Sequence, residues 1–332
     1  MAWKTVLFVA VLASTASGLA QSPVVLQAKS GPVDSTTQAE DVAFRDDSYQ
    51  RMTVPVLLSG SGPFRFMVDT GADRTAISRQ LAQSLNLAAG ANATLHSVAG
   101  VSRVETATVP DLQLSRKSVR VVNAPLLERE HMGADGILGV DSLRSQRIQF
   151  DFEHNIMSIA PSASADRFDE PDAIVITATR RKGRLIFTEA RINGRPVTVV
   201  LDTGSQVTIG NRALRQMLTG RSSDLTAEKV ELHSVTGATL SGNYLSVREL
   251  DMGGVSLKGL AVVFADAHTF RKLDLERKPA LLLGMNAIRA FKKVSIDFAT
   301  RKFRVVVPES SALEVDLASG QRLARKPARV GC

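Results

Sequence analysis

The sequence predicts an all-β protein made of two similar units in one chain. Three observations favour this fold class: a repeat that covers most of the chain, apolar residues that alternate with polar ones between glycine-rich turns, and no long stretch with helical periodicity. A length of 332 residues allows two domains, each with a core of its own. The missing helical periodicity and the lack of a glycine-rich phosphate loop disfavour a nucleotide-binding fold.

The N-terminus has the pattern of an export signal. Lys4 precedes an apolar run over 6–13, and the Gly-Leu-Ala sequence of 18–20 offers a cleavage site before Gln21. The run is too short to span a bilayer. Residues 1–20 are therefore predicted to be a signal peptide, and the mature protein to be periplasmic or secreted; the alternative is a buried N-terminal helix. Residues 21–40 form a polar segment, and the stretch 21–47 is either a short inhibitory prosegment or a tether.

An internal repeat organises the remainder of the chain. Four segments of the first half return in the second half in the same order. In pairs, they are 63–72 and 196–205, 95–100 and 232–237, 136–139 and 281–284, and 150–152 and 296–298. Only the loop lengths between them differ, and loops are where insertions are tolerated. The repeat predicts a first lobe over 41–160, a linker over 161–171, a second lobe over 172–308 and a basic C-terminal tail over 309–332.

Most segments of each copy are predicted to be strands. Val54, Val56 and Leu58 alternate with other residues before a turn, and Asn193-Gly194 is a strong hairpin signal in the second copy. The strands before the two Asp-Thr-Gly triplets, 66–68 and 199–201, are apolar on both faces and should be central and buried. One short helix is expected after each triplet, because apolar residues share one helical face there. These residues are Ile77, Leu81 and Leu85 in the first copy and Leu214, Met217 and Leu218 in the second.

The chemistry of the chain is concentrated in the paired Asp-Thr-Gly triplets, 69–71 and 202–204. In each, an apolar strand ends in a carboxylate, a hydroxyl follows, and glycine permits the turn that exposes the carboxylate. A lone triplet is most simply a strand-end turn or a cap. Two triplets at matching places of a repeat indicate a site that uses two carboxylates, Asp69 and Asp202.

On these residues, the chain resembles the aspartic peptidases. Two apolar residues precede each Asp-Thr-Gly-Ala/Ser sequence, and an apolar-apolar-Gly motif follows about seventy to eighty residues later. The run 69–75 is most similar to the retropepsin-like branch of that family. Retropepsins build one site from two identical subunits, whereas pepsins fuse two lobes in one chain. This chain therefore resembles two retropepsin-type units fused in the manner of pepsin.

The resemblance implies a two-lobed acid-protease fold, in which each lobe is a small closed β-barrel-like unit with one short helix. It implies that Asp69 and Asp202 meet at the lobe interface as the catalytic pair, and that Thr70 and Thr203 hydrogen-bond across it. The supporting positions of the two loops are Gly71, Ala72, Gly204 and Ser205. The apolar-Gly segments 137–139 and 282–284 would pack beside the catalytic strands.

Two carboxylates in a poorly solvated cleft cannot both ionise easily, so the pair is expected to hold one proton between them. The ionised member can take a proton from a water while the protonated member polarises the scissile carbonyl. The chain is therefore expected to be an aspartic endopeptidase acting on peptides or proteins, with no cofactor and no metal, since its five histidines show no ligand spacing. The alternative is a peptide-binding protein of the cell envelope that keeps the cleft without turnover.

One difference between the two triplets is informative. Ser205 follows the second triplet, whereas Ala72 follows the first. A serine hydroxyl that donates to Asp202 would stabilise its charged form, and Ala72 offers Asp69 no such donor. This gives the hypothesis that Asp202 is the more acidic member and that Asp69 carries the shared proton. The alternative is that Ser205 merely tolerates the turn.

Two similar hairpins are expected to close over the substrate. By resemblance, the flap tips and substrate-binding positions are Val98, Ala99, Gly100, Val235, Thr236 and Gly237. His96 and His233 recur at the flap bases, either as structural hydrogen-bonding residues or as pH sensors. Asp73 matches a substrate-contacting aspartate of the viral enzymes, but the arginine expected after the second apolar-Gly motif is missing. Asp73 is therefore either a substrate contact or part of a surface salt bridge.

The chain carries a net charge of +8, which favours anionic surfaces without defining any chemistry. The basic run 180–184 is predicted to be a charged, solvated hairpin turn. An anionic envelope surface is a candidate partner, and nucleic acid is not expected because no aromatic residues are interleaved with the charges. Cys332 is the only cysteine, so an internal disulfide is impossible and an intermolecular one is the remaining option. A monomer is expected, because both carboxylates come from one chain.

Overall fold

The computed structural model describes residues 52–114, 117–162, 170, 172–220 and 228–308. It also describes the backbone of four short strands, β1 (Thr5–Leu7), β2 (Val11–Ser14), β3 (Glu40–Ala43) and β4 (Arg45–Asp46). The remainder of the predicted signal peptide and polar segment, most of the linker, the basic tail and Cys332 lie outside the described residues. Within the described ranges, no helix is long and apolar enough to cross a membrane.

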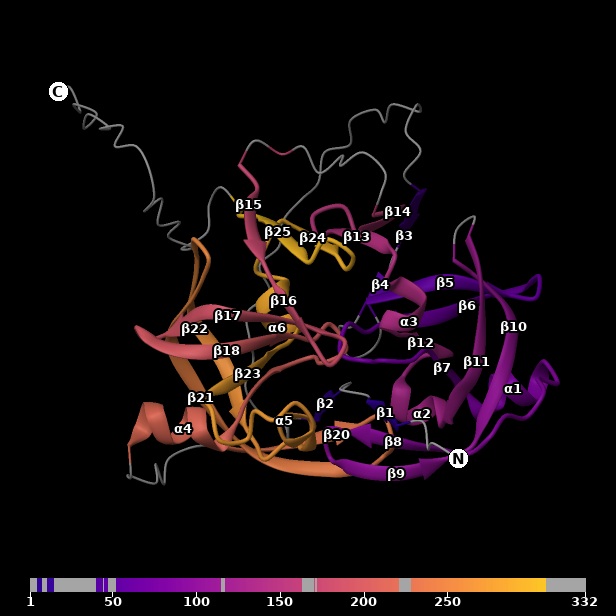
Figure 1. Cartoon of the computed structure of the whole chain (residues 1–332), viewed down its shortest axis with the longest axis horizontal. Coiled ribbons are helices and arrows are strands. Elements are labelled where there is room, and N and C mark those ends of the chain that lie inside the picture. The colour runs from indigo at the N-terminus through magenta and orange to yellow at the C-terminus, as the bar shows by residue number, and fades with distance from the viewer. Residues whose placement is uncertain are drawn as a thin grey trace.

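Six strands of the first lobe close into a barrel, shown in indigo and magenta in Figure 1. Around the barrel they are β10 (Thr106–Leu114), β11 (Lys117–Leu127), β7 (Ala76–Ser78), β12 (Gly136–Leu138), β6 (Ser61–Val68) and β5 (Met52–Leu58), with β5 pairing back to β10. The predicted alternation in β5 is borne out, since Val54, Val56 and Leu58 are all buried. The end of β6, 66–68, is buried on both faces as its apolar run predicts.

The second lobe repeats this barrel with the equivalent strands. They are β17 (Arg184–Ile192), β18 (Arg195–Leu201), β23 (Ala280–Leu283), β19 (Thr208–Gly210), β22 (Val255–Phe264) and β21 (Thr239–Met252), with β21 pairing back to β17. Asn193 and Gly194 turn the β17–β18 hairpin with φ values of 49° and 77°, which is the backbone that this dipeptide favours. The predicted all-β architecture of two lobes is therefore confirmed.

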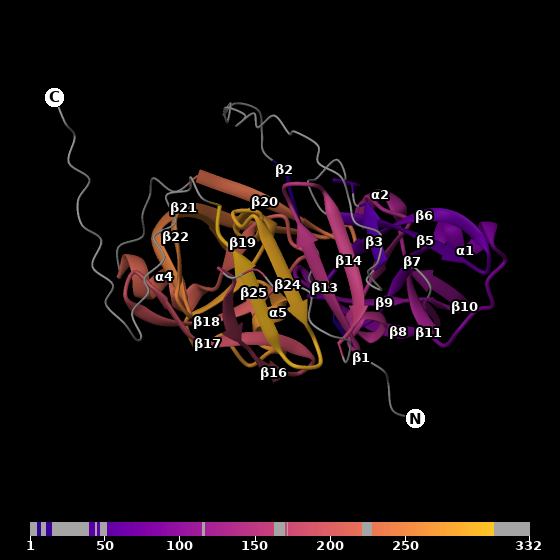
Figure 2. The same cartoon turned by 90° about the horizontal axis from the view of Figure 1, so that it is seen from above.

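A six-stranded sheet joins the lobes and lies across both of them in Figure 2. Its order is β15 (Ile174–Thr177), β25 (Lys302–Val306), β24 (Lys293–Asp297), β13 (Gln146–Asp151), β14 (Ile156–Pro161) and β3. The first lobe supplies β13 and the second supplies β24, and these two strands pair antiparallel at the centre. One apolar cluster runs from both barrels through this sheet and includes Val54, Phe150 and Phe298. Each fully buried phenylalanine stabilises the fold by about 2–3 kcal/mol.

Within its described residues, each lobe carries three short helices rather than the one that was expected. The helix after each triplet is present as α1 (Arg79–Ser84) and α4 (Arg212–Thr219), and Ser78 and Asn211 cap their first turns by accepting from Leu81 N–H and Leu214 N–H. The additional helices have four or five residues, which is too short for any periodicity to show in the sequence. They are α2 (Arg129–Met132), α3 (Val140–Leu143), α5 (His268–Lys272) and α6 (Met285–Ile288).

Two hairpins extend between the lobes on the side opposite the six-stranded sheet in Figure 1. The first consists of β8 (Ala93–Ser97) and β9 (Gly100–Val104), and the second of β20 (Glu228–Ser234) and the start of β21. We call them the first and second flap. The outer edges of β8 and β20 are paired with the short N-terminal strands, β1 along β8 and β2 along β20.

Candidate active site

The two Asp-Thr-Gly loops begin where the central strands of the two barrels end. Asp69 follows β6 and Asp202 follows β18, and both side chains are fully buried. The apolar-Gly strands hold each aspartate backbone in place, since Asp69 N–H donates to Leu138 O at 3.0 Å and Asp202 N–H to Leu283 O at 3.1 Å. β12 lies parallel to β6 and β23 parallel to β18, as the resemblance implies.

The two loops are tied to each other by reciprocal hydrogen bonds of their threonines. Thr70 N–H donates to Thr203 Oγ1 at 2.9 Å, and Thr203 N–H donates to Thr70 Oγ1 at 3.0 Å. Each hydroxyl then donates into the other lobe, Thr70 to Leu201 O at 3.2 Å and Thr203 to Val68 O at 2.8 Å. This network spans the lobe interface and fixes the two aspartates face to face.

Glycine at positions 71 and 204 permits the close approach of the carboxylates. Gly71 N–H donates to Asp69 Oδ1 at 2.7 Å, and Gly204 N–H donates to Asp202 Oδ1 at 3.2 Å. A Cβ at Gly71 would clash with the carboxylate of Asp202, and one at Gly204 with the carboxylate of Asp69. Each carboxylate therefore lies directly against the loop of the opposite lobe.

The environment of the pair favours a shared proton. Burial raises the pKa of Asp202 well above its usual range, and the negative charge of Asp69 raises it further. The positive charge of Arg184 and the N–H groups of Gly204 and Ser205 act in the opposite direction. Because the two groups are coupled, the pair as a whole is expected to carry one proton and one negative charge.

The hydroxyl of Ser205 does not serve Asp202 in the way that the sequence suggested. Ser205 Oγ donates to Val207 O at 2.6 Å, and a hydroxyl has only one proton to donate. The hypothesis that this hydroxyl makes Asp202 the more acidic member therefore loses its physical basis. Ser205 and Ala72 are both fully buried, and their carbonyl groups accept from Met285 N–H and Val140 N–H in matching positions.

The flap tips are inserted into the opposite lobes. Val98 of the first flap is fully buried in an apolar cluster of the second lobe that contains Val200 and Leu282. Val235 of the second flap is buried in a cluster of the first lobe that contains Met67 and Ile137. The neighbouring Ala99, Gly100, Thr236 and Gly237 are half-buried. Both flaps are therefore in a closed position over the loops.

Histidines lie where each flap contacts the helix of the other lobe. His96 Nδ1 and His268 Nε2 are 2.7 Å apart, and His268 N–H donates to Val98 O at 2.7 Å. On the other side, a Cβ at Gly237 of the second flap would clash with the imidazole of His131 in α2. The sequence singled out the flap histidines but not His131 or His268, because contacts between lobes leave no spacing signal in one chain.

Asp73 forms a salt bridge across the lobes rather than at the surface. Its Oδ1 lies 3.2 Å from a guanidinium nitrogen of Arg184, whose side chain is fully buried. The sequence placed Arg184 in a solvated hairpin turn, and this holds for its neighbours Arg181 and Lys182, which pair with Asp274. Arg184 differs because it begins β17 and points inward.

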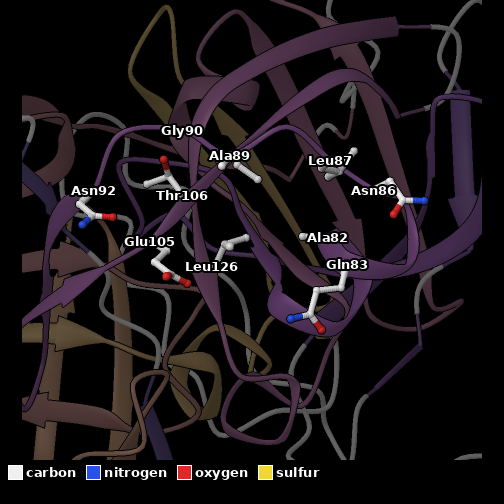
Figure 3. A pocket seen from close by; sticks show the side chains of 11 residues that line it. Ala82, Gln83, Asn86, Leu87, Ala89, Gly90, Asn92, Glu105, Thr106 and Leu126 are labelled. Atoms are coloured by element: carbon white, nitrogen blue, oxygen red, sulfur yellow. The ribbon is translucent and has the colours of Figure 1, made fainter.

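No site residue lines the groove shown in Figure 3. This open groove of about 650 Å³ lies on the first lobe between α1, the loop that follows it and the strands β10 and β11.

Among the described residues, one group brings three potential metal ligands within 4.8 Å of one another, namely Asp151, Glu153 and His154. It forms the turn of the β13–β14 hairpin, where Lys292 and Lys293 already balance its charge.

The fold and the paired loops define a two-lobed protein of the aspartic peptidase class. Two family models match in tandem: a gag-polyprotein putative aspartyl protease over 54–145 and an aspartyl protease over 188–287. Together they cover more than half of the chain, one in each lobe, and each match contains one Asp-Thr-Gly loop. The chain therefore belongs to the retropepsin-like aspartic peptidases. A comparison with curated proteins found no significant match.

Proposed function

We propose that this protein is an aspartic endopeptidase that hydrolyses peptide bonds with a water held between Asp69 and Asp202. The observation that carries the proposal is the reciprocal threonine network, which holds two buried carboxylates face to face at the lobe interface. The ionised carboxylate takes a proton from the water, and the protonated one donates to the carbonyl oxygen of the scissile bond. Because water attacks the carbonyl carbon, no covalent intermediate with the protein forms. When the C–N bond breaks, the newly protonated carboxyl donates to the leaving amine and the other carboxylate regains a proton from the tetrahedral intermediate, so the pair again holds one proton.

The flaps support a substrate that binds as an extended chain. The edges of β8 and β20 have backbone groups that pair with an added strand, as they do with β1 and β2. Addition of a strand to a sheet edge binds a polypeptide mainly through its backbone. A peptide or unfolded segment of a protein is the substrate that this arrangement favours.

Cleavage by the wild type and by two isosteric variants tests the proposal. Peptide-library and casein digests are analysed by mass spectrometry from acidic to neutral pH for the wild type, Asp69→Asn and Asp202→Asn. Both variants should lose activity by at least about 10²–10⁴-fold, because each removes one partner of the proton transfer. Equal cleavage by all three proteins would contradict the proposal. Peptide binding without cleavage by the wild type would favour the envelope binding protein instead.

The Asp202→Asn variant carries its own folding control. The raised pKa of Asp202 means that its ionised form is less favourable in the folded than in the unfolded chain, so this carboxylate destabilises the protein at neutral pH. Neutral asparagine removes that penalty. Asp202→Asn should therefore melt at the same temperature as the wild type or higher at neutral pH, and lost activity cannot then be assigned to unfolding.

We also propose that the protein is exported, on the signal-like pattern of residues 1–20. A mature chain that begins at Gln21 would lack β1 and β2 and would leave the edges of β8 and β20 open to substrate. N-terminal sequencing of the protein recovered from the envelope or medium tests this. An intact N-terminus at Met1 would contradict it.

A further inference from the structure

Arg184 is a fully buried cation beside the carboxylate pair. It is the largest side chain in the described part of the chain that is fully buried. A buried charge is strongly unfavourable unless anions and hydrogen-bond acceptors surround it. Its position therefore needs compensation from its neighbours, and those neighbours belong to the first lobe.

The guanidinium of Arg184 holds the first Asp-Thr-Gly loop from the second lobe. One terminal nitrogen donates to Thr70 O at 3.3 Å, and the other lies 3.2 Å from Asp73 Oδ1. Thr70 lies within the loop that presents Asp69, and Asp73 follows that loop. A planar guanidinium can serve both acceptors at once, which an ammonium cannot do with the same geometry.

The hairpin that carries Arg184 is anchored against the second lobe. Lys182 Nζ donates to Lys272 O at 2.8 Å and lies 2.6 Å from Asp274 Oδ2. Gly183 has a φ of 83°, and a Cβ there would lie 3.1 Å from Asp73 Oδ1. The turn 182–183 therefore packs on Asp73 and keeps Arg184 from leaving the interface.

The repeat duplicates the arginine but not its carboxylate partner: Arg51, which lies outside the described residues, stands at the place of Arg184 in the first copy. Gln206 follows the second triplet at the place that Asp73 has after the first. The carboxylate that neutralises Arg184 thus belongs to the first loop alone. The positive charge of Arg184 also acts on the aspartate pair, since it lowers the pKa of Asp202.

We propose that Arg184 is a positioning residue of the peptidase reaction, which fixes the first loop and supplies the positive charge that keeps one carboxylate of the pair ionised in acid. This inference rests on the proposed function for its catalytic consequence. Its electrostatic part concerns the aspartate pair itself, whether or not the protein turns over a substrate.

The test compares three substitutions in the full chain. Arg184→Met removes the charge at similar length, Arg184→Lys keeps the charge and loses the planar contact, and Arg191→Met is the matched control. Arg191 lies on the same strand, is exposed and bonds Gly194 O. The measurements are the pH profile of kcat/KM on a fluorogenic peptide and a thermal melt of each variant.

Arg184→Met should move the acidic limb of the profile to higher pH by about one unit, which is a tenfold loss of rate on that limb. The sign follows because loss of a nearby cation makes the carboxylates harder to ionise. Arg184→Lys should leave the limb near its wild-type position and lower kcat, and Arg191→Met should change neither. An unmoved limb in folded Arg184→Met would overturn the proposal.

A second variant and a second readout cover the remaining cases. Asp73→Asn removes the anion that neutralises Arg184, so the acidic limb should move to lower pH, opposite to Arg184→Met; a shift to higher pH would overturn the proposal. If Arg184→Met does not fold, the shift of the acidic limb in Asp73→Asn alone tests the proposal.

Titration of the aspartate carboxyl carbons in ¹³C-labelled protein measures the same pKa shifts without substrate. Wild-type protein that cleaves nothing would refute the proposed function, and the titration would still decide the effect of Arg184.

Discussion

The threonine network shows how single side chains hold two lobes in register. Thr203 Oγ1 accepts from Thr70 N–H and donates to Val68 O, and Thr70 Oγ1 makes the matching pair of contacts. All of these groups are buried, so each one that loses its partner is left without water as a substitute. The two hydroxyls therefore contribute to stability and to the placement of the aspartates at once.

Thr203→Val is expected to destabilise the protein by leaving Thr70 N–H and Val68 O without this hydroxyl. Each unsatisfied buried group costs about 1–3 kcal/mol. Thr203→Ser keeps the hydroxyl and should stay within about 1 kcal/mol of the wild type. Urea unfolding of the two variants measures the difference. Equal midpoints for valine and serine would contradict the importance of the hydroxyl.

The residues that the sequence singled out at the dyad are brought together, whereas those that tune it were not foreseen. The triplets are recognisable because the repeat places them at matching positions. Arg184 has a counterpart in the repeat, Arg51, but its contact with the dyad leaves no local signal, because its partners Thr70 and Asp73 lie in the other lobe. The direction of the Ser205 hydroxyl also depends on a single side-chain rotation, and its acceptor Val207 O is only two residues away.

At the scale of elements, the predictable parts were those with local signals. The Asn193-Gly194 turn and the apolar central strands follow from turn chemistry and burial on both faces. Helices such as α2 and α5 have no more than five residues and no local periodicity, so the sequence did not reveal them. They matter because each receives a flap tip from the other lobe.

The first flap contains a pH-sensitive contact. Burial, together with the nearby charges of Lys272 and His268, lowers the pKa of His96 to about 4. Burial, Arg271 and Lys272 also lower the pKa of His268, which Asp266 raises. Two neutral rings share one hydrogen bond, whereas two charged rings repel. The closed flap therefore binds fewer protons than an open flap with ordinary histidines.

The first flap is expected to open as the pH falls from about 6.5, the ordinary histidine value, to about 4. Spin labels at Val101→Cys in the flap and Glu276→Cys in the second lobe, in a Cys332→Ser background, report the distance by electron paramagnetic resonance. The short-distance population should shrink over this pH range. His96→Ala should remove the response and His154→Ala should keep it. An unchanged distance distribution in acid would contradict the prediction.

At the scale of the whole molecule, the N-terminal strands occupy the flap edges with which an extended substrate is expected to pair. β1 pairs with β8 over 94–96, and β2 pairs with β20 over 231–234. An extended substrate would need the same backbone groups. Removal of the segment that carries both strands would free them without any change in the two barrels.

The full chain is therefore expected to cleave peptides more slowly than a chain that begins at Gln21. The difference should be mainly in KM, because the strands block binding and leave the aspartate pair unaltered. Steady-state kinetics on one peptide measures both proteins. A full chain with Val6→Pro and Leu12→Pro, each of which removes a backbone N–H and disfavours a paired strand, should approach the shorter chain. Equal KM values for the full and shortened chains would contradict competition by the N-terminal strands.

The pairing of β13 with β24 bears on how such a chain can arise. Gln149 and Ser295 occupy the same position in the two copies of the repeat, and they lie opposite each other where β13 pairs with β24. The same strand edge of each lobe therefore contacts its own counterpart, so the contact is self-complementary. A half-length ancestor with such an edge could bind an identical copy of itself through it. Joining two such copies by a linker would turn a concentration-dependent dimer into a permanent one. Each half would then be free to diverge, as Asp73 and Gln206 have done.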